Sequence, residues 1–261
     1  MRIPALYIIG SGNLAWQLSK GLQQAGLNPT GIIARNKREG KKLAHARNCL
    51  FLDASRGITA KDAVFFCCVS DDAIDATMDA ISLSGARLIH CSGMHPLRAK
   101  AKLHKEQRAG VFYPVQSFNK KLEVDWKKIP VCIESHDRNT EKLLISIAQQ
   151  FAGPVYKMNS ATRAYVHLAA VFANNFGNAQ FAIAHQVLQL KKVSFDILKP
   201  LIAQTSEKVQ MSLPESVQTG PAIRNDSKTI AAHKKLLKEK PELSKIYTDL
   251  TQFIQLHLKK D

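Results

Sequence analysis

The chain has 261 residues, of which 45% are hydrophobic and 22% charged, which is enough apolar material for one or two folded domains. It contains no apolar run of the roughly eighteen residues that a transmembrane helix needs, and the apolar stretch at residues 3–9 is too short for a signal peptide. Five cysteines without a CxxC spacing predict neither a disulfide framework nor a zinc site, so we expect a cytoplasmic protein.

The net charge of +16 is spread over both halves of the chain rather than gathered in a basic tail. Such a charge attracts anions, whether nucleic acid, a phosphorylated cofactor or a carboxylate substrate. No helix-turn-helix, zinc-finger spacing or paired-aromatic RNA motif accompanies it, so nucleic acid is the least favoured of these partners. We expect most of the charge to form a solvated basic surface.

The first 157 residues alternate between strand-like and helix-like segments. Short apolar runs predict strands at residues 5–9, 31–34, 50–52, 63–69, 87–90, 111–112 and 130–133. Helical spacing predicts helices at residues 13–24, around Ala44, at 73–81 and at 139–151. This alternation predicts an α/β fold with a doubly wound, mostly parallel Rossmann sheet.

The remaining residues have helical spacing only. Residues 161–190 contain no proline and predict one helix of about 45 Å. Further helices are expected at residues 201–211, 227–240 and 241–260, with no strand after residue 156. We therefore expect a Rossmann dinucleotide-binding domain over residues 1–157, and an all-helical domain for substrate binding or dimerisation over residues 158–261.

The strongest chemical motif lies between the first strand and the first helix, where the sequence is Gly10-Ser11-Gly12-Asn13-Leu14-Ala15. This GxGxxA fingerprint stands in the setting that dinucleotide binding requires, and an ordinary strand–helix turn is the less favoured alternative. The first glycine permits a tight turn, the second lets backbone N–H groups approach a pyrophosphate, and Ala15 lets the helix pack on the strand. The helix N-terminus adds positive potential. We predict cofactor contacts from Gly10, Ser11, Gly12, Asn13 and Leu14.

The end of the second strand predicts NADP rather than NAD. An NAD site normally has an acidic residue there, about 20 residues beyond the fingerprint, but residues 1–38 contain no acid. Arg35 and Asn36 occupy the position, and Arg35 can bind a 2′-phosphate through two hydrogen bonds. Lys41 and Lys42, further along, are expected to cover only an exposed helix face.

Polar residues also follow the fourth and fifth strands, at the rim where open α/β sheets bind ligands. We predict cofactor contacts from Val69, Ser70 and Ser92, and expect Gly93 to allow a close approach to its backbone. Asp71 is expected to be a helix N-cap. His90 is equally consistent with a buried strand histidine and with a catalytic one.

The long helix carries an uncharged polar stripe, because no Lys, Arg, Asp or Glu occurs from residue 164 to 190. At 100° per residue, the stripe comprises His167, Asn174, Asn178 and His185. It predicts either a buried polar cleft or a dimer interface. For catalysis we single out His167, Asn174, Asn175 and, facing them, Ser92.

Six segments together resemble a known family: GSGNLA at 10–15, VSDDAI at 69–74, HCSG at 90–93, FYPVQSF at 112–118, HLAAVFANNF at 167–176 and TGPAIRND at 219–226. The chain resembles the Rossmann-like bacterial proteins with a C-terminal helical domain of unknown function, grouped with the NADP oxidoreductases. More distantly it is similar to pyrroline-carboxylate reductase, ketopantoate reductase and the hydroxyacid dehydrogenases. The resemblance implies a cofactor site and a cleft between domains, but no substrate. Tyr113 stands where many relatives have His before Pro, so the resemblance carries no general-acid role to that position.

These observations predict an NADP-dependent oxidoreductase that acts on a small keto, imine or hydroxy compound, with an anionic substrate favoured by the positive charge. A non-catalytic NADP-binding or sensing protein is the alternative. The uncharged helix predicts a homodimer. No metal site is expected.

Overall fold

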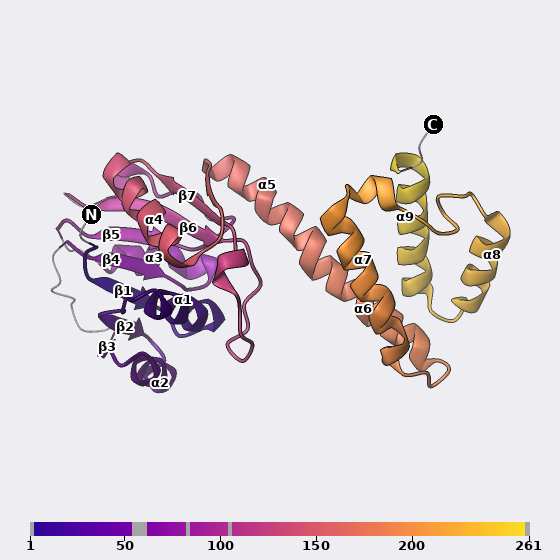
Figure 1. The fold of residues 1–261 in the computed structure, drawn as a ribbon, viewed down its shortest axis with the longest axis horizontal. Coiled ribbons are helices and arrows are strands. Elements are labelled where there is room, and N and C mark those ends of the chain that lie inside the picture. Colours follow the sequence, from indigo (N-terminus) through magenta and orange to yellow (C-terminus); the bar gives the residue numbers. More distant parts are fainter. Residues whose placement is uncertain (1–2, 54–61, 82–83, 104–105, 259–261) are drawn as a thin grey trace. The chain divides into compact units, whose positions relative to one another are not determined.

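The computed structural model describes residues 3–53, 62–81, 84–103 and 106–258 (Figure 1). The chain divides into two compact units, residues 1–175 and residues 176–261. Helix α5 (Ser160–Ala170) belongs to the first unit by its contacts. The predicted functional boundary at residue 157 stays a prediction.

The first unit is built on one eight-stranded sheet with the order β3-β2-β1-β4-β5-β6-β7-β8. The pairing is parallel everywhere except between β6 and β7. The chain order reverses between β1 and β4, which is where open α/β sheets bind their ligands. The fold prediction is therefore confirmed. The strands are β1 (Leu6–Ile9), β2 (Gly31–Ala34), β3 (Leu50–Asp53), β4 (Val64–Cys67), β5 (Arg87–His90), β6 (Arg108–Pro114), β7 (Val131–Ser135) and β8 (Val155–Lys157).

The alternation of side chains along the strands gives this sheet a core on each face. In β1, Leu6 and Ile8 belong to one cluster while Tyr7 and Ile9 belong to the other. Helices α1 (Asn13–Gln24), α2 (Lys37–Arg47) and α4 (Arg138–Phe151) supply the first cluster, and α3 (Ile74–Asp79) supplies the second. Short 3-10 turns connect these elements: η1 (Asp71–Ala73), η2 (Lys100–Lys102) and η3 (Trp126–Lys128).

The long helix is not the uninterrupted α-helix that its proline-free sequence predicts. Helix α5 gives way to a π-helical turn, η4 (Val171–Phe176), before α6 (Gly177–Gln189) begins. A π turn closes over five residues instead of four, so each of its residues rotates less about the helix axis. The 100° spacing that placed His167 on one line with Asn178 and His185 is therefore wrong across this turn.

The second unit consists of helices and turns, and within residues 158–258 no strand is present, as predicted. Its elements after α6 are η5 (Phe195–Leu198), α7 (Lys199–Met211), η6 (Pro214–Val217), α8 (Ser227–Leu236) and α9 (Pro241–His257). Asp226 caps α8 by accepting a hydrogen bond from the Thr229 N–H at 3.0 Å, and His233 Nδ1 lies 2.9 Å from the Tyr247 hydroxyl of α9. In the described part of the chain, every helix is too short or too polar to span a bilayer.

Candidate functional site

The fingerprint loop is shaped by a glycine that no other residue can replace without strain. Gly10 follows β1 with a φ of +117°, and its N–H donates to the Ile33 carbonyl of β2 at 2.8 Å. A Cβ atom at this position would lie 2.3 Å from the Cys68 carbonyl oxygen. The loop is thus pressed between the strands that flank β1, at the reversal of strand order.

The first turn of α1 is open to an anion. Gly12 occupies the N-cap position, no side chain caps the turn, and the turn contains no acidic residue. A Cβ on Gly12 would meet nothing within 4 Å among the described residues, so the backbone is accessible there. Asn13 is exposed, and its Oδ1 accepts a hydrogen bond from the Lys120 N–H at 3.2 Å. Ala15 is fully buried, as the fingerprint predicts. This geometry fits a pyrophosphate.

The end of β2 presents basic side chains whose acidic neighbours are already paired. Arg35 is exposed and makes no hydrogen bond or ion pair with the described residues. Asp53 at the end of β3 pairs with Lys37 at 2.7 Å. Glu39 pairs with Lys120 at 3.1 Å, which lowers the pKa of its carboxyl. The Asn36 Oδ1 accepts from the Glu39 N–H at 3.1 Å and so caps α2. The local field therefore favours an anion beside Arg35.

The loops after β4 and β5 are joined to each other by Ser92. Its hydroxyl donates to the Asp71 carboxylate at 2.8 Å and accepts from the N–H groups of Met94 and His95 at 3.0 and 2.9 Å. The expectation that Asp71 is an N-cap is wrong, because Ser70 occupies that position before η1 and Asp71 binds Ser92 instead. The Ser92 hydroxyl therefore donates its hydrogen to Asp71, within the protein. Val69 is half-buried and Ser70 exposed at the same rim.

His167 of α5 packs directly on the rim of the sheet. A Cβ on Gly93 would lie 2.7 Å from His167 Nδ1, so the close approach that Gly93 allows is used by this imidazole. His167 Nδ1 also lies 3.2 Å from the hydroxyl of Tyr113 in β6. His167 therefore lies close to the residue that follows Ser92 in the chain, and the expectation that His167 faces Ser92 across a substrate stays a prediction. Asn174 and Asn175 are exposed in η4.

A buried ion pair that the sequence did not reveal holds α5 in this place. Arg163, fully buried, pairs with Glu134 of β7 and donates to the His95 carbonyl at 2.5 Å. The Ser160 hydroxyl donates to Glu134 at 2.8 Å and accepts from the Leu97 N–H at 2.8 Å. The only sequence signal was that Arg163 is the last charged residue before the uncharged stretch.

The surroundings of His90 fit a buried strand histidine better than a catalytic one. It is fully buried in β5, and its Nδ1 accepts from the Ser92 N–H at 3.3 Å. Burial, followed by the charges of Arg163 and His95, lowers its pKa to about 3. A histidine that stays neutral under all ordinary conditions cannot cycle protons near pH 7.

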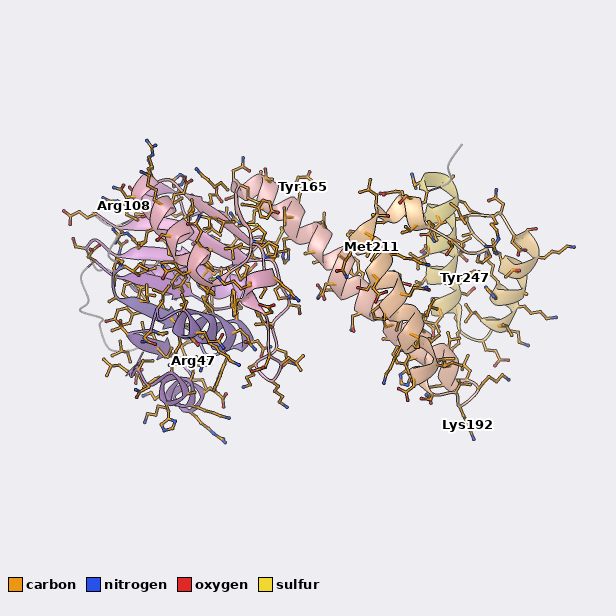
Figure 2. All side chains as sticks on the ribbon, in the orientation of Figure 1. Arg47, Arg108, Tyr165, Lys192, Met211 and Tyr247 are labelled. Atoms are coloured by element: carbon orange, nitrogen blue, oxygen red, sulfur yellow. The ribbon has the colours of Figure 1, made fainter. Side chains whose placement is uncertain are left out.

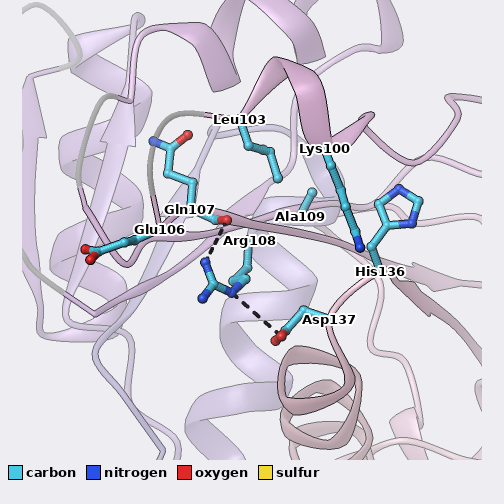
Figure 3. Close-up of a pocket in the computed structure, with 8 residues that line it drawn as sticks. All are labelled: Lys100, Leu103, Glu106, Gln107, Arg108, Ala109, His136 and Asp137. Carbon is cyan, nitrogen blue, oxygen red and sulfur yellow. Dashed lines mark hydrogen bonds and ion pairs between the residues drawn. The ribbon is translucent and has the colours of Figure 1, made fainter.

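A separate polar pocket lies at the start of β6 (Figure 3). Because β6 runs parallel to β5, β4 and β1, this is the end of the strands opposite to the one that carries the fingerprint loop. It has a volume of about 350 Å³ and contains none of the predicted site residues. In this pocket Arg108 Nε lies 3.7 Å from Asp137 Oδ1, so the two residues form an ion pair. Asp137 also caps α4. The lining residues are Lys100, Leu103, Glu106, Gln107, Arg108, Ala109, His136 and Asp137.

Residues 129–254 match a domain of unknown function, DUF2520, and no curated protein matches the chain at a significant level. Reductive aminase from Aspergillus terreus, solved with NADPH and ethyl levulinate, has 14% identity, covers 97% of this chain and 93% of its own, and gives a TM-score of 0.69. Pyrroline-5-carboxylate reductase from Coxiella burnetii has 16% identity over all of both chains and a TM-score of 0.56. These two share the fold.

A third structure is more similar. BF3122 from Bacteroides fragilis, ascribed to the NADP oxidoreductases, is 32% identical, with a TM-score of 0.88. The match covers 97% of this chain and 98% of BF3122. The chain therefore belongs to the same family as BF3122, the Rossmann-fold proteins with a C-terminal domain of unknown function.

Proposed function

We propose that the protein is an NADP-dependent oxidoreductase acting on a small keto, imine or hydroxy compound. The observation that carries this proposal is the loop at the reversal of strand order, where Gly10 has a positive φ and lies against Cys68, and where no side chain caps the first turn of α1. BF3122 is ascribed to the NADP oxidoreductases, and the reductive aminase was solved with NADPH and a ketone. BF3122 supports the NADP oxidoreductase, and the reductive aminase supports a carbonyl or imine as the reacting group.

The residues around the fingerprint fit a dinucleotide. The backbone of Gly10, Ser11, Gly12, Asn13 and Leu14 would hold the pyrophosphate, since its N–H groups begin an uncapped helix. Arg35, with Asn36, would hold the 2′-phosphate, because its charge is not neutralised by a neighbouring acid. Val69, Ser70 and Ser92 would border the nicotinamide. When bound, that cofactor supplies the hydride.

His167 is the side chain best suited to the reacting oxygen or nitrogen. It is half-buried, lies against Gly93 at the rim of the sheet, and carries an imidazole that can donate or accept a proton near pH 7. Asn174 and Asn175 could orient a carbonyl or carboxylate without titrating. The net charge of +16 favours an anionic substrate.

We further propose a cytoplasmic homodimer. All five cysteines are free thiols, and Cys68 and Cys91 have sulfurs only 4.0 Å apart without being joined, which suits a reducing compartment. Tyr165 on α5 and Met211 on α7 are 75% and 84% exposed (Figure 2). Exposed apolar side chains of this kind are typical of surfaces that a second copy covers.

The test is NADPH oxidation with a panel of ketones offered with amines, cyclic imines and 2-keto acids. Turnover with any member supports the oxidoreductase, whereas tight NADPH binding without turnover favours the sensing protein. His167→Ala and Asn174→Ala should keep NADPH affinity within about twofold while removing turnover, since both are assigned to the substrate side. If either variant loses NADPH binding while still folded, that assignment is wrong.

A further inference from the structure

The phenol of Tyr113 is the polar group that touches His167. Its hydroxyl lies 3.2 Å from His167 Nδ1, and the two rings meet edge to face with centroids 5.9 Å apart. No other hydrogen bond links either group to the described residues. The role of this pair depends on which partner donates.

The phenol hydrogen takes part in this hydrogen bond in only one of its two directions. If Tyr113 donates, Nδ1 accepts the hydrogen bond and the imidazole proton is on Nε2. If Nδ1–H donates instead, the phenol hydrogen has no acceptor among the described residues, although the side chain is only 8% exposed. A donor without an acceptor is disfavoured, and this decides between two tautomers of similar energy.

We propose that Tyr113 is a positioning residue, which donates to His167 Nδ1 and thereby holds His167 in the tautomer whose proton is on Nε2. The catalytic consequence rests on the proposed function. With Nε2–H as donor, His167 stabilises negative charge that develops on a substrate oxygen or nitrogen. Such a donor is required when a carbonyl or imine is reduced, because its oxygen or nitrogen gains negative charge as the carbon receives the hydride.

The surroundings of Tyr113 keep its phenol protonated. Burial in β6, with the neighbouring Cys132 of β7, raises its pKa, and Arg163 of α5 opposes this only in part. Arg163 forms an ion pair with Glu134, and the carboxylate offsets much of its positive charge near Tyr113. A phenol that does not ionise near neutral pH remains a hydrogen-bond donor.

The ring of His167 packs closely on Gly93 as well as on Tyr113. Gly93 lies so close that a Cβ there would overlap both Nδ1 and Cγ of the imidazole, at 2.7 and 2.8 Å. Arg163, one turn earlier on the same helix face, is fixed to β7 and to the loop after β5. The two anchors hold the imidazole edge against the phenol.

The tautomer can be measured directly on the full chain labelled with ¹⁵N-histidine, without any substrate. Long-range proton–nitrogen correlation spectra, recorded at about pH 8 where a histidine of ordinary pKa is neutral, distinguish Nε2–H from Nδ1–H. The spectrum of His167→Gln assigns the His167 signals among the nine histidines. Tyr113→Phe removes only the hydroxyl. Tyr7→Phe is the matched control, because Tyr7 is buried on β1 and stacked on Phe65 away from His167.

We expect the wild type and Tyr7→Phe to show His167 as the Nε2–H tautomer, and Tyr113→Phe to lose this preference. Turnover by Tyr113→Phe should fall in kcat about two- to tenfold with KM unchanged, the effect of one neutral hydrogen bond. An Nδ1–H tautomer in the wild type, or the same spectrum in Tyr113→Phe, would overturn the proposal. The spectra are independent of NADPH binding, so failure of the proposed function and failure of this inference are separate results.

Discussion

Gly10 and Gly12 stand two residues apart in one loop, but their backbones meet different constraints. Gly10 has a positive φ and lies against the Cys68 carbonyl, whereas Gly12 has an ordinary φ of −78° and open space at its Cα. The first glycine is needed for the fold. Gly12 is needed only if a ligand approaches the backbone. Substitutions at Gly10 and Gly12 therefore test folding and ligand binding separately.

Gly10→Ala should therefore lower the free energy of unfolding by about 2–5 kcal/mol, through backbone strain and overlap with Cys68. Gly12→Ala should change it by less than about 1 kcal/mol, because the N-cap position tolerates this backbone, yet weaken NADPH binding at least about tenfold. Urea unfolding and NADPH titration of both variants measure these effects. Wild-type affinity for NADPH in Gly12→Ala would contradict the assignment of the loop.

His90 gives the protein a predictable dependence on pH. Because burial lowers the folded-state pKa to about 3, the unfolded chain, with a pKa near 6.5, binds the proton first as the pH falls. Stability from His90 is thus fully present above pH 6.5 and is lost between about pH 6.5 and pH 3. From pH 7 to pH 5 this histidine alone should remove about 2 kcal/mol.

Urea unfolding of the wild type and of His90→Asn at both pH values tests this dependence, since the variant should lose the histidine's share of the pH slope. His136→Gln is the control, because His136 is exposed and its replacement should leave the slope unchanged. An equal slope in His90→Asn and wild type would mean that His90 binds its proton as readily in the folded protein as in the unfolded chain.

Single residues were predictable where their role is local. Gly10 and Ala15 follow from spacing, since their partners lie in the neighbouring strand or turn. The bond from Ser92 to Asp71 joins residues 21 apart, and the pair of Arg163 with Glu134 joins residues 29 apart. Such contacts exist only after strands and helices have been brought together, so no periodicity in the sequence reveals them.

At the scale of elements, apolar content predicted the buried strands and failed at β8, on one edge of the sheet. Strand β5 was predicted with the bounds found, as was helix α1. Strand β8 was missed, because two of its three residues are exposed and it has no apolar run. Strand β6 is longer than the predicted residues 111–112, since its pairing with β7 includes polar positions. The π turn η4 has no signature in hydrophobic spacing.

The attachment of α5 to the sheet depends on the buried pair of Glu134 and Arg163. The Arg163 side chain has no exposed surface and that of Glu134 is 15% exposed, so Glu134→Gln leaves a buried charge without its partner. We expect a loss of about 3–5 kcal/mol in the free energy of unfolding. Adding Arg163→Met should recover part of it, because the two changes remove one shared interaction.

The matched control for this pair is Glu141→Gln. Glu141 forms an ion pair with Lys157 at 2.6 Å, but the lysine side chain is 60% exposed, so the change should cost less than about 1 kcal/mol. Urea unfolding of the three variants measures all of these values. If Glu134→Gln is as stable as Glu141→Gln, the buried pair does not anchor α5.

At the scale of the whole molecule, the apolar surface predicts self-association. The uncharged stretch from residue 164 to 190 contains exposed apolar side chains, and more lie on α7 and α9. They include Tyr165 in the first unit, and Phe181, Leu190, Leu201 and Phe253 in the second. A stable interface needs about 1,000 Å² or more, and a two-fold dimer would cover such a surface on both copies at once.

Sedimentation at micromolar concentration should therefore give a dimer, and Phe181→Asp should shift it toward monomer by placing a charge in the covered surface. Asn139→Asp is the control, since it adds the same charge on exposed α4 in the first unit. A wild type that sediments only as a monomer would contradict the proposed dimer.

Titration of the protein with NADPH and with NADH tests the central claim most directly. One charged hydrogen-bonded contact to the 2′-phosphate contributes about 1.5–3 kcal/mol, so NADPH should bind about ten- to a hundredfold more tightly than NADH. Arg35→Ala should remove this preference by weakening NADPH alone, while Lys41→Ala, which removes the same charge from an exposed position on α2, should retain it. Equal affinities for NADPH and NADH in the wild type, or no binding of either, would contradict the account.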